Sequence, residues 1–265
     1  PTKTEQADLN QALYGRNGEA PLPIIAAATP GDCFFAAYEA SSIALKYMIP
    51  VVLLTDGYLA NGSEPWKIPK VKDLKPIDVK FEKPSKTENE YLPYKRDKDT
   101  LSRPWAIPGT AGLQHRVGGL EKAEDSGHVS YDPDNHHRMV EIRQEKVNRI
   151  QNDIDPTEVY GSNNGDLLII SWGGTYGSCR SAIETLHDEG KSVSHVHLRW
   201  INPLPKDLGE IIIKFKNVLV PEINMGQLIK LIRSEYLVDA KGLNQVTGKP
   251  ISASKIIETV KKMIG

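Results

Sequence analysis

Two apolar runs enclose a helical pattern near the start of the chain. The runs PIIAAA at 23–28 and VVLLTD at 51–56 are short and uninterrupted, as in strands buried on both faces. Between them, apolar side chains from Phe34 through Tyr38 and Leu45 to Met48 recur with helical spacing. A strand, a helix and a strand in this order predict a βαβ unit with parallel strands.

The last third of the chain repeats this alternation. The apolar runs at 166–171, 193–200 and 217–222 predict further buried strands. Helices are predicted between and after them, at 178–190, 206–215, 225–237 and 252–265. The predicted fold class is therefore α/β, with two doubly wound parallel-sheet domains.

The middle of the chain lacks a sustained period. The segment 57–130 is rich in Pro, Lys, Glu and Gly, which favours a long connection that wraps the surface. A helix is predicted at 131–150, with Asp132 as its cap and Pro133 in its first turn. These patterns divide the chain into residues 1–70, a connecting region at 71–159, and residues 160–265.

Charge and cysteine content exclude several classes of function. The net charge is −1, which gives no electrostatic reason to bind nucleic acid or an anionic membrane. No apolar run approaches the roughly 20 residues that span a bilayer. The two cysteines, Cys33 and Cys179, predict no disulfide framework and suit a reducing cytoplasm. They are also too few to hold an iron–sulfur cluster, which takes four thiolates as a rule.

A glycine-rich turn follows the predicted strand at 166–171. Gly173, Gly174 and Gly177 would let a ligand's anionic group approach the backbone at the start of the next helix. The spacing differs from a dinucleotide fingerprint, and a tight turn that needs glycine for its geometry is the alternative. Asp56 ends the strand at 51–56, where it either serves a site or caps the next turn.

The opening segment is dense in side-chain hydrogen-bond donors. Thr2, Lys3, Gln6, Arg16 and Asn17 suit an anionic carboxylate or phosphate, and these residues are the first candidates for a ligand pocket. The alternative is a solvated, capped helix over TEQADLNQALYG.

Histidines and cysteines give weaker signals. His195 and His197 alternate along a predicted strand and share one face, but no third ligand is evident, so packed histidines are expected and no metal site. His136 and His137 are adjacent on a helix and point apart. Cys33 lies in a first helical turn without a local base, which favours a buried small side chain over a nucleophile.

Several longer stretches resemble one enzyme family. The chain resembles the carboxyl-terminal two-thirds of the α subunit of 2-oxoacid:ferredoxin oxidoreductases, the 2-oxoglutarate type most closely. The matching stretches, in the family's order, are PTKTEQADLNQALYGRNGE, ATPGDCFFAAYEASSIALKYMIPVVLLTDGYLA, PGTAGLQH, DPDNHHRMVEIRQEKV, LRWINPLP and VPEINMGQLIKLIR. The resemblance implies that residues 1–70 belong to a pyrimidine-binding domain and 160–265 to a transketolase-like carboxyl-terminal domain.

The resemblance also implies a reaction and a set of partners. Members of this family decarboxylate a 2-oxoacid oxidatively, with coenzyme A accepting the acyl group and ferredoxin the electrons. Their β subunit carries the thiamine diphosphate, Mg²⁺ and a 4Fe–4S cluster, and this chain contains no G-D-G stretch of the kind that holds Mg²⁺ in thiamine enzymes. The chain then starts just past the substrate-binding residues, and we expect no catalytic residue in it and no activity or tight cofactor binding by it alone.

Three readings stay open at this point. The first is a part of such an oxidoreductase, working with a β subunit in a hetero-oligomer or as a homodimer. The second is an assembly module whose domains build a subunit interface. The third is a pyruvate-specific or non-redox transketolase-like relative.

Overall fold

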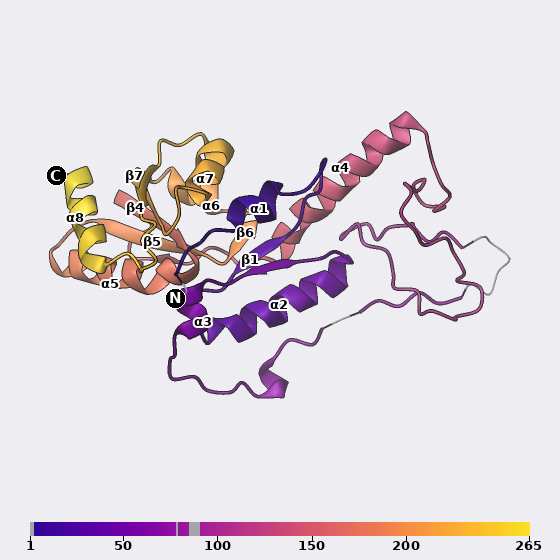
Figure 1. Ribbon diagram of the computed structural model, residues 1–265, viewed down its shortest axis with the longest axis horizontal. Helices are drawn as coiled ribbons and strands as arrows, with labels where there is room; N and C mark the ends of the chain where they lie inside the picture. The colour runs from indigo at the N-terminus through magenta and orange to yellow at the C-terminus, as the bar shows by residue number, and fades with distance from the viewer. Residues whose placement is uncertain (1–2, 78, 85–90) are drawn as a thin grey trace.

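Helices and strands alternate along most of the computed structural model, which describes residues 3–77, 79–84 and 91–265 (Figure 1). The α-helices are α1 (Leu9–Tyr14), α2 (Asp32–Tyr47), α3 (Gly57–Asn61), α4 (Pro133–Arg149), α5 (Tyr176–Asp188), α6 (Leu208–Ile212), α7 (Leu228–Tyr236) and α8 (Ala253–Ile264). The strands are β1 (Ile24–Ala26), β2 (Val52–Leu54), β3 (Val159–Tyr160), β4 (Gly165–Trp172), β5 (Val193–Leu198), β6 (Trp200–Asn202), β7 (Phe215–Glu222) and β8 (Lys241–Asn244). Short 3₁₀ turns lie at η1 (Val71–Asp73), η2 (Ile150–Asp153) and η3 (Gly173–Thr175).

Two sheets organise these elements. One has the strand order β2-β1-β6 and the other the order β3-β5-β4-β7-β8. The pairs β1–β2, β4–β5, β4–β7 and β7–β8 are parallel, whereas β1–β6 and β3–β5 are antiparallel. The predicted α/β fold with parallel-rich sheets is confirmed.

The predicted strand at 193–200 is divided between the two sheets. β5 ends at Leu198, and β6 begins at Trp200 and pairs with β1 instead. Arg199 lies at the crossing, where its guanidinium meets Asp32 at 3.0 Å and Glu39 at 2.9 Å on α2. These ion pairs, together with a 2.7 Å hydrogen bond from Trp200 Nε1 to Glu39, hold the chain against α2. The smaller sheet therefore combines strands that are far apart in the sequence.

Three apolar clusters fill the spaces between the layers. One packs a face of the larger sheet, including Leu168 and Ile170, against α1, α6, α7 and a face of β1. A second packs the opposite face of the larger sheet against α5 and α8. The third joins α2 to β1 and includes the buried side chains of Ile150 and Trp200. The first cluster spans both sheets, so the two sheets share a core.

The buried face of α2 differs from the predicted one. Its buried side chains are Ala36, Ala40, Ile43 and Tyr47, whereas Phe34 is 39% exposed. Small alanine side chains in the first half of the helix let it approach the sheet closely, and Phe34 and Phe35 lie on the outer face of that half. There the Phe34 ring stacks on Tyr38 and also contacts the rings of Phe35 and Trp66.

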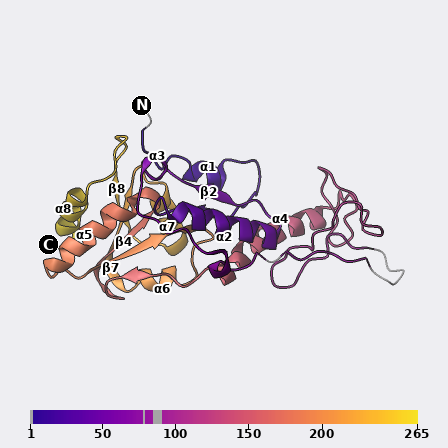
Figure 2. The same cartoon turned by 90° about the horizontal axis from the view of Figure 1, so that it is seen from below.

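The segment between α3 and α4 has little regular structure among its described residues. Figures 1 and 2 show it reaching past the end of α2 and lying beside the outer half of α4. It is attached to α2 by a 2.9 Å hydrogen bond from Trp105 Nε1 to the Leu45 carbonyl oxygen. Asp132 caps α4 as predicted, because its carboxylate accepts a 2.7 Å hydrogen bond from the Asn135 amide. In the part of the chain that the structure describes, no helix is both long and apolar enough to cross a membrane.

The core that joins α5 to the larger sheet allows a direct test. Ile183 on α5 is fully buried, whereas Ile213 is 81% exposed. Replacing Ile183 with Ala should lower the free energy of unfolding by about 2–5 kcal/mol, because the lost methyl groups leave a cavity. Ile213→Ala, the matched control, should change it by less than about 0.5 kcal/mol. Urea denaturation of both variants measures this difference, and equal losses would contradict the packing described.

Candidate functional site

The carboxyl ends of β2 and β4 meet at a polar junction, which we call the seam. Asp56 follows β2, and Gly174 lies in the turn that follows β4. The Gly174 amide donates a 2.7 Å hydrogen bond to Asp56 Oδ2. The amides of Tyr58 and Leu59 donate to Oδ1 at 2.9 and 3.1 Å, so the same carboxylate caps α3. Asp56 is 7% exposed, and its charge is balanced by three backbone amides.

Gln6 is the second component of the seam and is 3% exposed. Its side-chain amide donates to the Trp172 carbonyl at 2.6 Å, and its side-chain oxygen accepts from the Ile223 amide at 3.0 Å. Its backbone also bonds the Ile223 carbonyl at 3.2 Å and the Asn224 side chain at 3.0 Å. The opening segment is thereby fixed to the ends of β4 and β7.

A fully buried carboxylate at the end of β7 completes the junction. Glu222 Oε1 accepts hydrogen bonds from Trp172 Nε1 at 3.2 Å, Asn224 Nδ2 at 3.0 Å and the Leu228 amide at 2.7 Å. Its other oxygen accepts from the Ile229 amide at 3.1 Å. Glu222 thus satisfies amides at the start of α7. Sequence reasoning missed it, although an acidic residue at the end of a buried strand was the available signal.

The remaining candidates from the sequence are scattered. Thr2 lies outside the described residues. Lys3 is exposed and runs beside Gly248, and Gly177 is also exposed. Arg16 and Asn17 precede β1, at the opposite end of that strand from the seam, and Asn17 is exposed. The structure therefore brings Gln6, Gly173 and Gly174 together with Asp56, and leaves the others apart from them.

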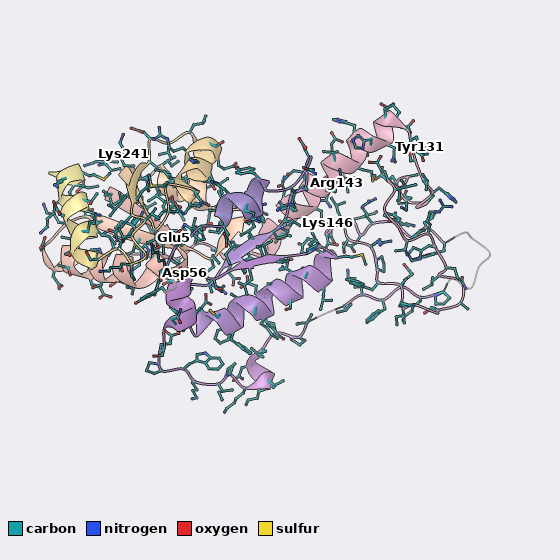
Figure 3. All side chains as sticks on the ribbon, viewed as in Figure 1. Glu5, Asp56, Tyr131, Arg143, Lys146 and Lys241 are labelled. Carbon is teal, nitrogen blue, oxygen red and sulfur yellow. The ribbon has the colours of Figure 1, made fainter. Side chains whose placement is uncertain are left out.

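The seam itself encloses little space. A cavity of about 30 Å³ lies between Glu5, Gln6, Thr55, Asp56 and Gly173. Figure 3 shows Glu5 and Asp56 near one another at this junction. A space of this size holds about one water molecule, so these residues do not enclose a substrate on their own.

A larger cavity lies along the same edge of the sheets. It measures about 280 Å³ and includes Thr29 and Asp32 at the start of α2, Arg180 on α5, and His195 and His197 on β5. The size approaches that of a small-molecule site. Positive and negative side chains both line it, which favours a small polar ligand over a strongly charged one.

One hydroxyl connects the two histidines. Ser171 Oγ lies 2.6 Å from His195 Nε2 and 2.7 Å from His197 Nδ1. A hydroxyl can donate to only one ring, so the other ring donates to it. Burial, with Arg180 adding to it, lowers the pKa of His195 to about 3. Burial also lowers the pKa of His197, helped by His195 and Arg199, so both rings are neutral at pH 7.

Two buried nitrogens at this cavity have no protein partner among the described residues. They are His197 Nε2 and Arg199 Nη2. Buried polar atoms are paired as a rule, so both are positioned to meet a polar ligand or water in the cavity. Within the described residues, no group of three or more His, Cys, Asp or Glu side chains could hold a metal ion. Burial raises the pKa of the Cys179 thiol to about 12 and also raises that of Cys33, so neither is a ready nucleophile.

Comparison with family models decides the classification. A model described as pyruvate flavodoxin/ferredoxin oxidoreductase, thiamine diphosphate-binding, matches residues 1–133. A second, pyruvate:ferredoxin oxidoreductase core domain II, matches residues 165–256. The chain belongs to the 2-oxoacid:ferredoxin oxidoreductase family. The resemblance stated from the sequence is confirmed.

Individual relatives from this oxidoreductase family align with nearly the whole chain. The chain is 48% identical to 2-oxoglutarate oxidoreductase subunit KorA of Mycobacterium tuberculosis over 97% of its own length and 39% of that protein. It is 29% identical to 2-oxoacid:ferredoxin oxidoreductase 1 subunit alpha of Aeropyrum pernix, over 98% of its own length and 41% of that subunit. The chain thus spans about two fifths of the length of these curated relatives.

A solved structure of the oxidoreductase family superposes on all of the chain. It is the 2-oxoglutarate:ferredoxin oxidoreductase from Magnetococcus marinus with 2-oxoglutarate, coenzyme A and succinyl-CoA bound. The TM-score is 0.91 at 32% sequence identity, over 100% of this chain and 46% of that one.

The packing at the seam predicts opposite effects of an alanine at Gly174 and at nearby Gly177. A Cβ added at Gly174 would lie 2.4 Å from Asp56 Oδ2, and that carboxylate is fixed by its other hydrogen bonds. Gly174→Ala should therefore lower the free energy of unfolding by about 2–4 kcal/mol. Gly177→Ala meets nothing within 4 Å and lies in the first turn of α5, so it should raise stability by about 0.5–1 kcal/mol. Urea denaturation distinguishes the two, and a neutral Gly174→Ala would disprove the tight contact.

The neutral histidines predict a pH dependence of stability. The folded pKa of His195 is about 3 and its ordinary value is 6.5, so between these values the unfolded chain binds a proton that the folded chain does not. The free energy of unfolding should then fall as the pH drops below 6.5, by up to about 1.4 kcal/mol per pH unit for each such histidine. His195→Gln should reduce that slope, as measured by urea denaturation at pH 7, 6 and 5. An unchanged slope would contradict the burial of a neutral ring.

Proposed function

We propose that this chain is part of the α subunit of a thiamine diphosphate-dependent 2-oxoglutarate:ferredoxin oxidoreductase. The enzyme would convert 2-oxoglutarate and coenzyme A into succinyl-CoA and CO₂, and pass two electrons to ferredoxin. The observation that carries this proposal is the superposition of the full chain on the Magnetococcus marinus enzyme, whose structure holds 2-oxoglutarate, coenzyme A and succinyl-CoA. The 48% identity to a 2-oxoglutarate oxidoreductase subunit supports the same substrate.

The residues of the seam do not fit the diphosphate end of thiamine diphosphate. The Gly174 amide, which an anion would need, already binds Asp56, and an atom at the Cβ position of Gly174 would clash with that carboxylate. We therefore assign the diphosphate, Mg²⁺ and 4Fe–4S cluster to a partner β subunit, and no step here runs through them. This chain's residues would shape and orient one wall of the complete site.

The division into residues 1–70, 71–159 and 160–265 forms part of the proposal. The second family match begins at residue 165, close to the proposed start of the third part, whereas the first match runs from 1 to 133 across the boundary proposed at 70. The β1–β6 pair crosses this division, so we infer that the first and third parts hold a fixed relative position.

An assembly role is the second candidate function, and one observation favours it. Gln6 bonds backbone groups of its own chain instead of pointing into a cleft. The opening segment would then fix the wall of the site without touching substrate. In either case we propose a cytoplasmic hetero-oligomer with the β subunit, with ferredoxin as electron acceptor.

A reconstitution assay tests the function. The complete α subunit is mixed with its β subunit, and reduction of a viologen dye is followed without oxygen. We expect reduction that requires both 2-oxoglutarate and coenzyme A. Lys3→Ala should lower kcat/KM without changing the Tm if exposed Lys3 meets substrate. Gln6→Ala should instead lower the Tm, because it leaves the Trp172 carbonyl and the Ile223 amide unpaired.

The same assay can reject the proposal. A folded, thiamine-loaded complex that reduces no dye with any 2-oxoacid would favour a non-redox or assembly role. Activity with pyruvate in place of 2-oxoglutarate would reassign the substrate and keep the reaction.

A further inference from the structure

Another cavity lies at the far end of α2 from the seam. It measures about 320 Å³ and is bounded by the 20–22 loop before β1, residues 48–50 before β2, and α4. α2 has 16 residues, and at 1.5 Å per residue its two ends are roughly 24 Å apart. Figure 3 shows Arg143 and Lys146 on α4, well away from Asp56 and Glu5 at the seam.

The charged side chains that line this cavity are all positive. They are Arg16, Arg96, Arg143 and Lys146, contributed by three separate segments of the chain, and no Asp or Glu lines it among residues 3–77, 79–84 and 91–265. The guanidinium of Arg16 donates hydrogen bonds to backbone carbonyl oxygens, of which the Ala20 oxygen is nearest, at 2.8 Å. Arg96 donates to the Tyr94 carbonyl at 3.2 Å, and no carboxylate of the described residues lies within hydrogen-bond distance of it. The positive charge of the cavity is thus not neutralised from within it.

Two of these cations are unpaired. Within the described residues, neither Arg143 nor Lys146 makes a hydrogen bond or an ion pair. Lys146 is half-buried, and burial lowers its pKa to about 8, with Arg96 and Arg103 adding to that effect. Burial also lowers the pKa of Arg96, and the nearby carboxylates of Glu124 and Asp125 oppose that shift. A half-buried lysine among arginines is unfavourable without an anion.

A neighbouring cavity shows the contrasting arrangement. It measures about 660 Å³ and lies within the connecting segment, with Lys80 and Asp97 among its lining residues. There Asp97 meets Lys80 at 3.2 Å, and hydrogen bonds from the Thr100 and Asp99 amides contribute to lowering the Asp97 pKa to about 2. An internal carboxylate therefore balances positive charge in that cavity, whereas the Arg143–Lys146 cavity lacks one.

The rest of the lining indicates the ligand's shape. Pro21, Leu22, Ile49 and Pro50 form an apolar wall of the cavity. A guanidinium fork matches phosphate oxygens in pairs, and several convergent cations favour a dianion over a single carboxylate. We propose that this cavity binds a phosphate monoester, with the phosphate held by Arg96, Arg143 and Lys146 and the organic body against the apolar wall. Binding is measured without turnover, so this proposal stands apart from the oxidoreductase assignment.

Phenyl phosphate is the probe for the site, titrated calorimetrically into the complete α subunit in phosphate-free buffer. The double variant Arg143→Gln/Lys146→Met removes both unpaired charges and keeps similar side-chain volume. It should weaken binding at least about tenfold. Arg138→Gln on the same helix is the matched control, because Arg138 pairs with Glu124 and Glu141 outside the cavity. Its affinity should equal that of the unmodified protein.

The affinity should also depend on pH in a defined way. A phosphate monoester becomes a dianion above its second pKa of about 6. Lys146 loses its proton above about pH 8. Binding should therefore be strongest between these values, and Lys146→Met should remove the decline on the alkaline side.

A parallel titration with coenzyme A and with dephospho-coenzyme A identifies the source of the phosphate. Coenzyme A carries a 3′-phosphate monoester, and dephospho-coenzyme A lacks it. If the double variant weakens coenzyme A but not dephospho-coenzyme A, the 3′-phosphate is the occupant. If it weakens only phenyl phosphate, the occupant is a separate phosphate ester, and both results support the site.

Two outcomes would overturn the proposal. One is the absence of saturable phenyl phosphate binding at millimolar concentration. The other is an unchanged affinity in the double variant while its Tm stays at or above the normal value. Folding failure is not expected, because Lys146→Met removes a charge whose burial is unfavourable.

Discussion

The buried carboxylate of Asp56 is the interaction on which the relation between the two sheets depends. It is reached by amides from α3 and from the turn after β4, and the carboxylate itself leaves no room for a side chain at Gly174. An anion held by three amides is directional, because each N–H must point at an oxygen. Gly174 is therefore required by an internal anion, which takes the place that an external phosphate would occupy in a nucleotide-binding turn.

The shared core follows from this link. Because Asp56 fixes the end of β2 against the end of β4, β1 and β4 can place Ile24, Ala26, Leu168 and Ile170 in one apolar cluster. The crossing at Arg199 adds a second connection, since the chain leaves the larger sheet at the end of β5 and pairs with β1 as β6. The two halves recognised by separate family models thus pack as one body around common side chains.

The sequence predicted what depends on local pattern. Apolar runs located the central strands β1, β2, β4, β5 and β7, and capping residues located the start of α4. It missed β3 and β8, because two- and four-residue edge strands carry no apolar run. It placed Gln6, Asp56 and Gly174 among the candidates but could not place them together, since their contacts join segments more than a hundred residues apart. The sharing of one face by His195 and His197 was predicted from their alternation, whereas Ser171, their common partner on the neighbouring strand β4, was missed because the sequence does not give the strand register.

The two ends of α2 differ in how their charges are balanced, and that difference indicates where a ligand can add stability. At the seam, Asp56 and Glu222 have all their oxygens engaged by groups of the same chain, so an incoming ion would have to displace existing bonds. At the other end, Arg143 and Lys146 have no described partner, so an anion there would gain contacts without breaking any. Net charge conceals this asymmetry, because a total of −1 averages over both ends. Local charge balance, which requires the folded chain, separates a structural junction from a binding site.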